Sequence, residues 1–267
     1  MKINIKKMNK IYQELRDLEN LIINLERKKI DDNDQIELDK FYRKRLKLFN
    51  LYKNLNKEFP LKNKEFSILK KLEKTLNTNI VSVKNQKKES IAYYCNNEEG
   101  IIEFTIKNIE LNQIPFEIFE LKYIRKLSLI NSCISKIPLS ISKLDHLKLL
   151  NLNGNMIKNV PKSLCSLRNL KKIVLSNNKI KSIPECLFSL KNITQLYLDN
   201  NLINLIPNAI SNLNSLSILK LKNNKIKKLP ESLLTLKNIE LIDIRNNPVA
   251  DSIDPTMLRL DQLIVKN

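Results

Sequence analysis

The 267-residue sequence has few of the residues on which catalytic and metal sites depend, with one histidine, two glycines and no tryptophan. Because glycine is so scarce, the chain has neither a phosphate-binding loop nor a dinucleotide fingerprint. The four cysteines, Cys95, Cys133, Cys165 and Cys186, do not show the paired spacings of a zinc site or a disulfide framework. We therefore expect no cofactor, no metal ion, unpaired thiols and a reducing compartment.

Long apolar runs are also absent. Nowhere do about 18 apolar residues follow one another, which predicts a chain without a transmembrane segment. The first 20 residues are basic and lack the apolar core of a secretory signal, which favours a cytoplasmic location. Both predictions follow from what the sequence does not contain.

Acidic residues are in the minority, since 28 Asp and Glu face 47 Lys and Arg, for a net charge of +19. The excess is spread over the whole chain, so no single basic tail explains it. Such a charge favours nucleic acid or an acidic membrane surface as a partner. The alternative is compositional bias, because the chain is rich in Lys, Asn and Ile throughout.

What the sequence has in abundance is a 23-residue repeat, whose copies we number coil 1 to coil 7. The coils begin at Ile101, Ile124, Leu147, Leu170, Ile193, Leu216 and Ile239. In the first six, positions 1, 4, 6, 11, 14, 18 and 21 are all apolar and position 15 is proline. Position 9 is asparagine in five coils, at Asn155, Asn178, Asn201, Asn224 and Asn247.

This pattern has a direct physical interpretation. Apolar residues at positions 4 and 6 indicate a strand with one buried face, and such strands must stack in a parallel sheet to cover it. The proline suits the first position of a short helical turn. The asparagines at position 9 are predicted to form a structural ladder, because a side-chain amide can satisfy inward-facing backbone groups.

The pattern LxxLxLxxNxLxxLPxxLxxLxx resembles that of the leucine-rich repeat family, and in particular the intracellular Ras-group and Scribble-like members. The resemblance covers residues 101 to about 250. It implies an α/β solenoid, a right-handed horseshoe with a parallel sheet on the concave side. It also implies a non-catalytic scaffold that binds a protein partner, with a role in intracellular signalling.

Positions 3, 5 and 7 of each coil should point out of the concave sheet, and their residues do not repeat. Scattered apolar residues and an aromatic at such positions are typical of partner-binding surfaces. The predicted contact residues are Tyr197, Leu149, Val174, Ile130, Ile218, Leu241, Lys172, Asp199, Lys220 and Asp243. The partner's identity and the oligomeric state stay open at this point.

The alternative function is a basic nucleic-acid or ribonucleoprotein-binding protein, suggested by the charge. Against it, the lysines of the repeats fall largely outside the concave sheet, and the aromatic residues that stack on single strands are sparse. An enzyme is not expected. His146 lies in a loop between coils, and neither Cys133 nor Cys186 has a neighbouring base.

The residues before the repeats have a different pattern. Apolar residues from Ile11 to Leu25 step by three and four, which predicts that residues 1–76 form a helical, coiled-coil-like bundle. Residues 77–100 fit either a linker or a degenerate N-terminal capping repeat. The repeats span 101–247, and residues 248–267 are expected to form a C-terminal cap.

Overall fold

The computed structural model describes residues 14, 17, 44, 67–69, 71–72, 75–76, 81–82, 91–96, 100–251 and 263–264. The chain divides into two compact units, Met1–Ser67 and Ile68–Asn267. In the first unit Glu14, Asp17, Lys44 and Ser67 are helical, and the other residues of that unit, and with them most of the expected helical bundle, lie outside the described residues. The same holds for most of 77–90 and 252–267.

Helical residues just before the repeats belong to the second unit. Ile68, Leu69 and Leu72 are buried in the same hydrophobic core as the coils. Thr75 Oγ1 donates a hydrogen bond of 2.7 Å to Oε1 of Glu117 in coil 1. The expected bundle boundary at residue 76 and the boundary between the two compact units therefore differ by nine residues, because this helical stretch covers the open end of the repeat core.

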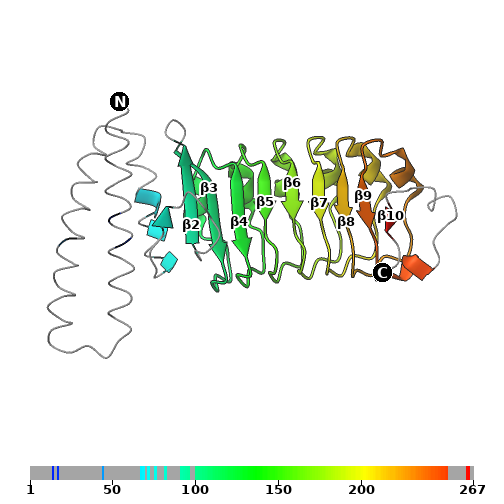
Figure 1. Ribbon diagram of the computed structural model, residues 1–267, viewed down its shortest axis with the longest axis horizontal. Helices are drawn as coiled ribbons and strands as arrows, with labels where there is room; N and C mark the ends of the chain where they lie inside the picture. The colour runs from blue at the N-terminus through cyan, green and yellow to red at the C-terminus, as the bar shows by residue number, and fades with distance from the viewer. Residues whose placement is uncertain are drawn as a thin grey trace. The chain divides into compact units, whose positions relative to one another are not determined.

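The second unit is built on one ten-stranded sheet whose strands follow one another in chain order. The strands are β1 Val81–Ser82, β2 Ile91–Asn96, β3 Gly100–Lys107, β4 Lys126–Ile130, β5 Leu149–Asn151, β6 Lys172–Val174, β7 Gln195–Tyr197, β8 Ile218–Lys220, β9 Leu241–Asp243 and β10 Leu263–Ile264. Strands β3 to β9 are parallel, and paired residues such as Leu150 and Ile173 are one repeat apart (Figure 1).

The core consists of the residues at the seven apolar positions. In coils 1 to 6 these side chains are buried, apart from Leu111, which is partly buried and packs against the others. In β5 to β8 the central residue of three is buried and its two neighbours are partly exposed. This confirms the solenoid predicted from the repeat.

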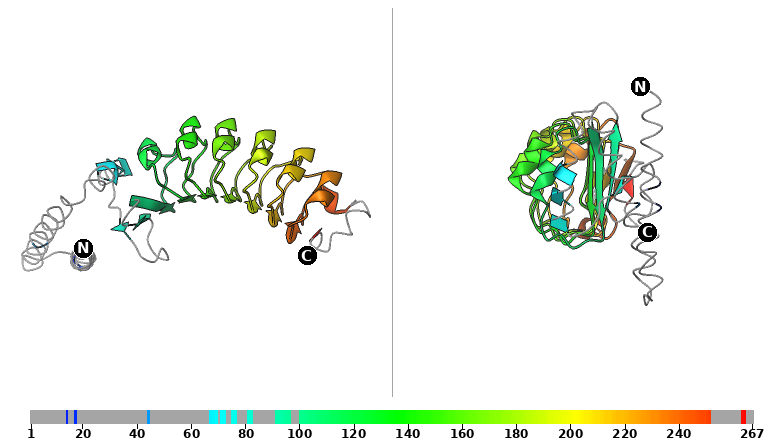
Figure 2. Two further views of the ribbon diagram at one scale, coloured as in Figure 1. Left: turned by 90° about the horizontal axis from the view of Figure 1, so that it is seen from above. Right: turned by 90° about the vertical axis from the view of Figure 1, so that its left-hand side faces the viewer.

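Short 3-10 helices return the chain on the side opposite the sheet, which lies on the inner, concave side of the stacked coils (Figure 2). They are η1 Phe116–Glu120, η2 Leu139–Lys143, η3 Lys162–Ser166, η4 Glu185–Ser189, η5 Asn208–Asn212, η6 Glu231–Thr235 and η7 Pro248–Asp251. In η1 to η6 the repeat proline is the residue before the helix, not its first residue as expected. Its carbonyl accepts the first helical hydrogen bond, as Pro161 does from Leu164 at 3.1 Å.

The described parts of the two ends extend the sheet. Strand β2 pairs antiparallel with β3, and β1 pairs parallel with β2. In a further repeat, Ile91 would occupy a buried position after the strand, whereas here it begins β2. The choice between a linker and a degenerate capping repeat for residues 77–100 therefore stays a prediction. At the other end β10 pairs parallel with β9.

One expectation about the cysteines is wrong. Cys165 in η3 and Cys186 in η4 are joined by a disulfide, with Cα atoms 5.7 Å apart and a sequence separation of 21. The bond was missed because stacking places residues about one repeat apart side by side, a proximity that short-range cysteine spacing does not reveal. Cys133 is a free thiol. Among the described residues, no helix is long and apolar enough to cross a bilayer.

Candidate functional site

The central part of the concave face contains Leu149, Lys172, Val174 and Tyr197, all of them partly exposed. Leu149 pairs with Lys172 across β5 and β6, and Val174 pairs with Tyr197 across β6 and β7. The Nζ of Lys172 lies 4.7 Å from the centre of the Tyr197 ring, close enough for a cation–π contact. The structure thus joins four predicted contact residues in one patch, which we call the central patch.

The remaining apolar residues of the predicted set lie to either side. Ile218 and Leu241 are paired neighbours on β8 and β9 and are partly exposed. Ile130 lies apart from the central patch, at the C-terminal end of β4, whereas Leu149 begins β5. The apolar and aromatic residues of the predicted set, together with Lys172, therefore form one patch, one adjacent pair and one separate residue.

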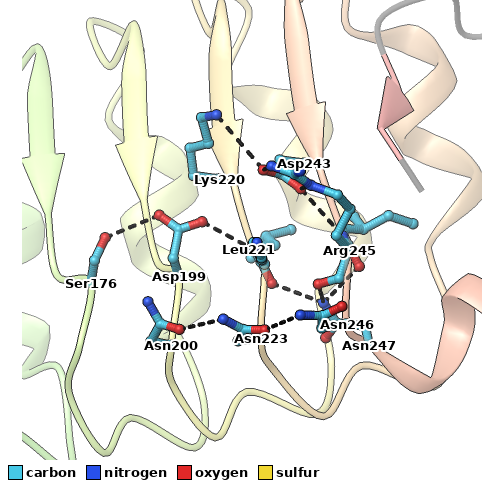
Figure 3. A network of polar contacts seen from close by, with 12 residues as sticks. Ser176, Asp199, Asn200, Lys220, Leu221, Asn223, Asp243, Arg245, Asn246 and Asn247 are labelled. Atoms are coloured by element: carbon cyan, nitrogen blue, oxygen red, sulfur yellow. Dashed lines mark hydrogen bonds and ion pairs between the residues drawn. The ribbon is translucent and has the colours of Figure 1, made fainter. Parts of the chain in front are cut away.

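A network of charged residues adjoins the central patch over β7 to β9 (Figure 3). Asp243 receives hydrogen bonds from Nε and Nη2 of Arg245 at 2.9 and 2.8 Å, and Nζ of Lys220 lies 3.7 Å from its Oδ2. Asp199 accepts hydrogen bonds from Ser176 Oγ and from the backbone N–H of Lys222, each at 3.2 Å. The network crosses four coils and fixes the side chains at this end of the face.

Asp243 was expected to contact a partner, but its side chain is only 2 % exposed. Arg245 and Lys220 bind its carboxylate, so it holds other residues in place and does not reach the surface. Asp199 and Lys220 stay partly exposed. Arg245 and Ser176 were missing from the predicted set; Ser176 bonds to Asp199 one coil away, and Arg245 bonds to Asp243 within its own coil.

The two carboxyl groups are shifted in opposite directions. Burial raises the pKa of Asp199 above its ordinary value, and the hydrogen bonds from Ser176 and Lys222 offset this only in part. Burial also acts to raise the pKa of Asp243, but the hydrogen bonds and charge of Arg245, with the charge of Lys220, hold that pKa below its ordinary value. Ionised Asp243 therefore stabilises the fold, whereas ionised Asp199 does not.

This contrast gives a pH-dependent prediction. Asp243→Asn should lower the free energy of unfolding at pH 7 by about 2 kcal/mol, because it removes a charged hydrogen-bond acceptor from Arg245. The stabilisation from Asp243 is present above its unfolded pKa and disappears as pH falls through its folded pKa, so the difference from wild type should shrink towards pH 3. Urea unfolding at both pH values measures it.

The matched variant for that measurement is Asp199→Asn. Because the pKa of the wild-type Asp199 carboxyl is raised, the contribution of this residue to stability is present at low pH and is lost as pH rises through the folded pKa. At pH 7 the substitution should therefore be neutral or slightly stabilising. A loss of stability at pH 7 equal for the two variants would contradict the assignment of opposite roles.

The asparagines at position 9 form a buried ladder. In Asn178, Oδ1 accepts the backbone N–H of Ile157 at 3.0 Å, and Nδ2 donates to the carbonyls of Leu152, Leu175 and Ser176. The same pattern recurs at Asn155, Asn201, Asn224 and Asn247. In coil 2, where serine stands at this position, the carbonyl of Ser132 accepts the N–H of Leu111 at 2.9 Å.

A second row at position 8 was missed by sequence reasoning. Its residues all have positive φ values between 52° and 70°, a conformation that asparagine and glycine tolerate best. They are Asn108, Asn131, Gly154, Asn177, Asn200, Asn223 and Asn246. Several bond to one another, as Asn246 does to Asn223 and Asn223 to Asn200 (Figure 3). The signal was present, because every coil has Asn or Gly at this position.

Gly154 interrupts this second row. A Cβ atom at this position would collide with Oδ1 of Asn131 in the preceding coil. The next asparagine, Asn177, bonds instead to the side chain of Asn153 at 2.9 Å. The row therefore continues past the glycine by using a neighbouring residue.

Chemical groups for catalysis do not gather on the described part of the chain. No group of three or more His, Cys, Asp or Glu residues in that part is arranged to hold a metal ion. His146 is exposed in a loop, where its ring lies 5.9 Å from that of Tyr123. The concave face instead offers a rigid surface with apolar, aromatic and charged side chains.

Comparison with known proteins finds the same repeat and the same fold elsewhere. The family model of the leucine-rich repeat matches residues 146–203. No curated protein matches the chain. A leucine-rich repeat protein from Leptospira interrogans is 23% identical, with a TM-score of 0.53, over 66% of this chain and 52% of that one. Internalin C2 from Listeria monocytogenes is 24% identical, with a TM-score of 0.53, over 63% of this chain and 71% of that one.

A third structure is the ectodomain of a plant membrane receptor kinase from Arabidopsis thaliana, solved in complex with Casparian strip integrity factor 2. It is 25% identical, with a TM-score of 0.51, over 57% of this chain and 19% of that one. The chain thus spans about half the length of the Leptospira protein and a fifth of the Arabidopsis ectodomain. The repeat and the family match show that this chain contains leucine-rich repeats, and these neighbours share the fold of its repeat solenoid.

Proposed function

We propose that the protein is a non-catalytic scaffold that binds a protein partner on its concave face, with the central patch as the main contact. The observation that carries the proposal is that Leu149, Val174 and Tyr197 are partly exposed at positions where the fold does not require them. The buried positions of each coil already supply the core. Exposed apolar and aromatic side chains grouped on one face are the usual anchors of a protein interface.

The size and rigidity of the face support this function. Seven strands spaced by about 4.8 Å give a surface on the order of 30 Å across, enough for a helix or a small domain. The charged network around Asp243 holds Lys220 and Arg245 in fixed positions beside the apolar residues. A surface with preset side chains loses less conformational freedom on binding.

Two finer points belong to this proposal. A role in signalling rests on the resemblance to intracellular members of the family. The cytoplasmic location expected from the sequence stays a prediction, and the Cys165–Cys186 bond counts against it, because disulfides persist mainly in oxidising compartments. The bond lies away from the concave face, since it joins η3 and η4 on the opposite side.

The experiment is crosslinking and affinity capture from native extract of the source cells, followed by mass spectrometry. The variant Leu149→Asp/Tyr197→Asp should capture at least tenfold less of the main partner, because it places two charges in the apolar contact. The matched control is Tyr123→Asp/Leu139→Asp, which changes the same residue types at exposed positions away from the central patch.

The control should capture the partner as the wild type does, and all three proteins should show the same circular dichroism spectrum. Loss of capture only in the control would place the contact on the convex side. Capture that is unchanged in both variants would exclude the central patch as the binding site.

A further inference from the structure

The segments that leave the sheet in coils 2 to 6 differ in charge from the remainder of the protein. Residues 131–137, 154–160, 177–183, 200–206 and 223–229 contain seven lysines, no acidic residue and no aromatic residue. The lysines are Lys136, Lys158, Lys179, Lys181, Lys225, Lys227 and Lys228. We call this surface the lysine edge. It is the edge towards which the arrowheads of β4 to β8 point in Figure 1.

Backbone hydrogen bonds keep the lysine edge regular. The N–H of Lys179 donates to the carbonyl of Ile157, and that of Lys225 donates to Ile203, at 2.9 and 2.8 Å. Met156 and Leu202 make the same bond to the preceding coil. Residues at position 10 therefore form a row, one per coil, and the edge extends over about 19 Å from coil 2 to coil 6.

The lysines of this edge are exposed and not neutralised. All seven are exposed, and none forms an ion pair with another residue in the part of the chain that the structure describes. Two large apolar side chains lie among them: Leu205 is 61% exposed and Met156 is 44% exposed. Leu205 is in coil 5, between the lysines of coil 4 and those of coil 6.

We propose that the lysine edge is a docking surface for an anionic lipid membrane. Uncompensated lysines in a row complement the negative potential of acidic headgroups, and that attraction acts within a Debye length of the surface. Leu205 and Met156 would enter the interface between headgroups and acyl chains, which supplies the second, apolar contribution that stable peripheral binding requires.

The apolar residues favour a membrane over other anionic partners. A phosphodiester backbone offers no apolar surface, so an exposed leucine in the centre of the lysine edge would add nothing to the affinity for nucleic acid. Single-stranded nucleic acid is further disfavoured, because the edge has no aromatic side chain on which a base could stack. The membrane proposal accounts for both the lysines and Leu205.

The test is co-sedimentation of the full chain with two kinds of vesicle, one of phosphatidylcholine alone and one that also contains about 30 mol% phosphatidylserine. The wild type should bind only the vesicles with phosphatidylserine and should dissociate as salt rises. Lys179→Gln/Lys181→Gln/Lys225→Gln/Lys227→Gln should weaken binding between about a hundredfold and a thousandfold, because each basic residue near such a surface adds roughly fivefold. Leu205→Ser should weaken it about tenfold.

Two matched controls separate this edge from overall charge and apolar exposure. Lys143→Gln/Lys171→Gln/Lys191→Gln/Lys237→Gln removes the same charge at exposed positions near the opposite ends of the strands and should change binding by less than tenfold. Leu139→Ser removes an exposed leucine from η2 and should have no effect. Leu149→Asp/Tyr197→Asp should still bind vesicles, so failure here is distinguishable from failure of the proposed partner site.

Several outcomes would overturn the proposal. Equal binding to neutral vesicles would exclude the lysines as its cause, and equal losses in both lysine variants would reduce it to net charge. A third outcome is that the chain binds a 20-base-pair duplex (about two helical turns) through these lysines but does not bind vesicles. If Leu205→Ser leaves that binding unchanged, the edge is assigned to nucleic acid. The same result with polyglutamate would assign it to an acidic protein.

Discussion

Replacing Asn178 by alanine is expected to lower the free energy of unfolding by about 3 kcal/mol, because a buried backbone N–H loses its acceptor. The amide oxygen of Asn178 is the acceptor for Ile157 in the previous coil, and its amide nitrogen donates to three carbonyls in coils 3 and 4. The carbonyls of Leu152 and Leu175 keep a second donor, from Asn155 and Asn201. The N–H of Ile157 keeps none among the described residues.

The measurement is urea unfolding of the purified chain at pH 7. Asn204→Ala is the control, since this exposed asparagine is one coil further along and its loss should change stability by less than about 0.5 kcal/mol. Asn178→Asp should be at least as destabilising as Asn178→Ala, because it keeps the acceptor but turns a negative charge towards carbonyl oxygens. Equal stability of Asn178→Ala and Asn204→Ala would mean that the ladder adds little to the fold.

The fold could be predicted because the same pattern of apolar residues, asparagine and proline recurs from coil to coil. Ile173 and Leu196 occupy the same position in two coils and are buried for the same reason. A departure from the pattern in one coil does not obscure it, because the other coils still show it. The ladder at position 9 follows in the same way, since Asn155 and Asn247 perform one task in different coils. Repetition converts a weak local signal into a reliable one.

The candidate site is less predictable, because its residues do not repeat. Asp243 stands at a position that points out of the sheet, yet Arg245 and Lys220 cover it. Whether a concave residue is available depends on the size and charge of its neighbours in its own coil and in the adjoining coils, and these differ from one repeat to the next. The same limit applies to Lys172, whose contact with Tyr197 joins two coils.

The largest effect of the environment is expected at the Cys165–Cys186 bond. Reduction should lower the free energy of unfolding by about 3 kcal/mol, because the bond closes a loop of 22 residues and restricts the unfolded chain. Because coils 3 and 4 lie in the middle of the repeats, weakening their junction should affect cooperative unfolding of the solenoid. Urea unfolding with and without dithiothreitol measures the difference, after peptide mapping has identified the linked pair.

Variants separate this bond from other effects of the reductant. Cys165→Ser and Cys186→Ser should each match the reduced wild type and should not respond to dithiothreitol, whereas Cys133→Ser should keep the full response. A wild type that unfolds at the same urea concentration in both conditions would show that the bond is absent or without effect. If the expected difference is found, a chain in a reducing compartment is less stable by that amount. The compartment then sets the stability of the central coils that carry both the central patch and the lysine edge.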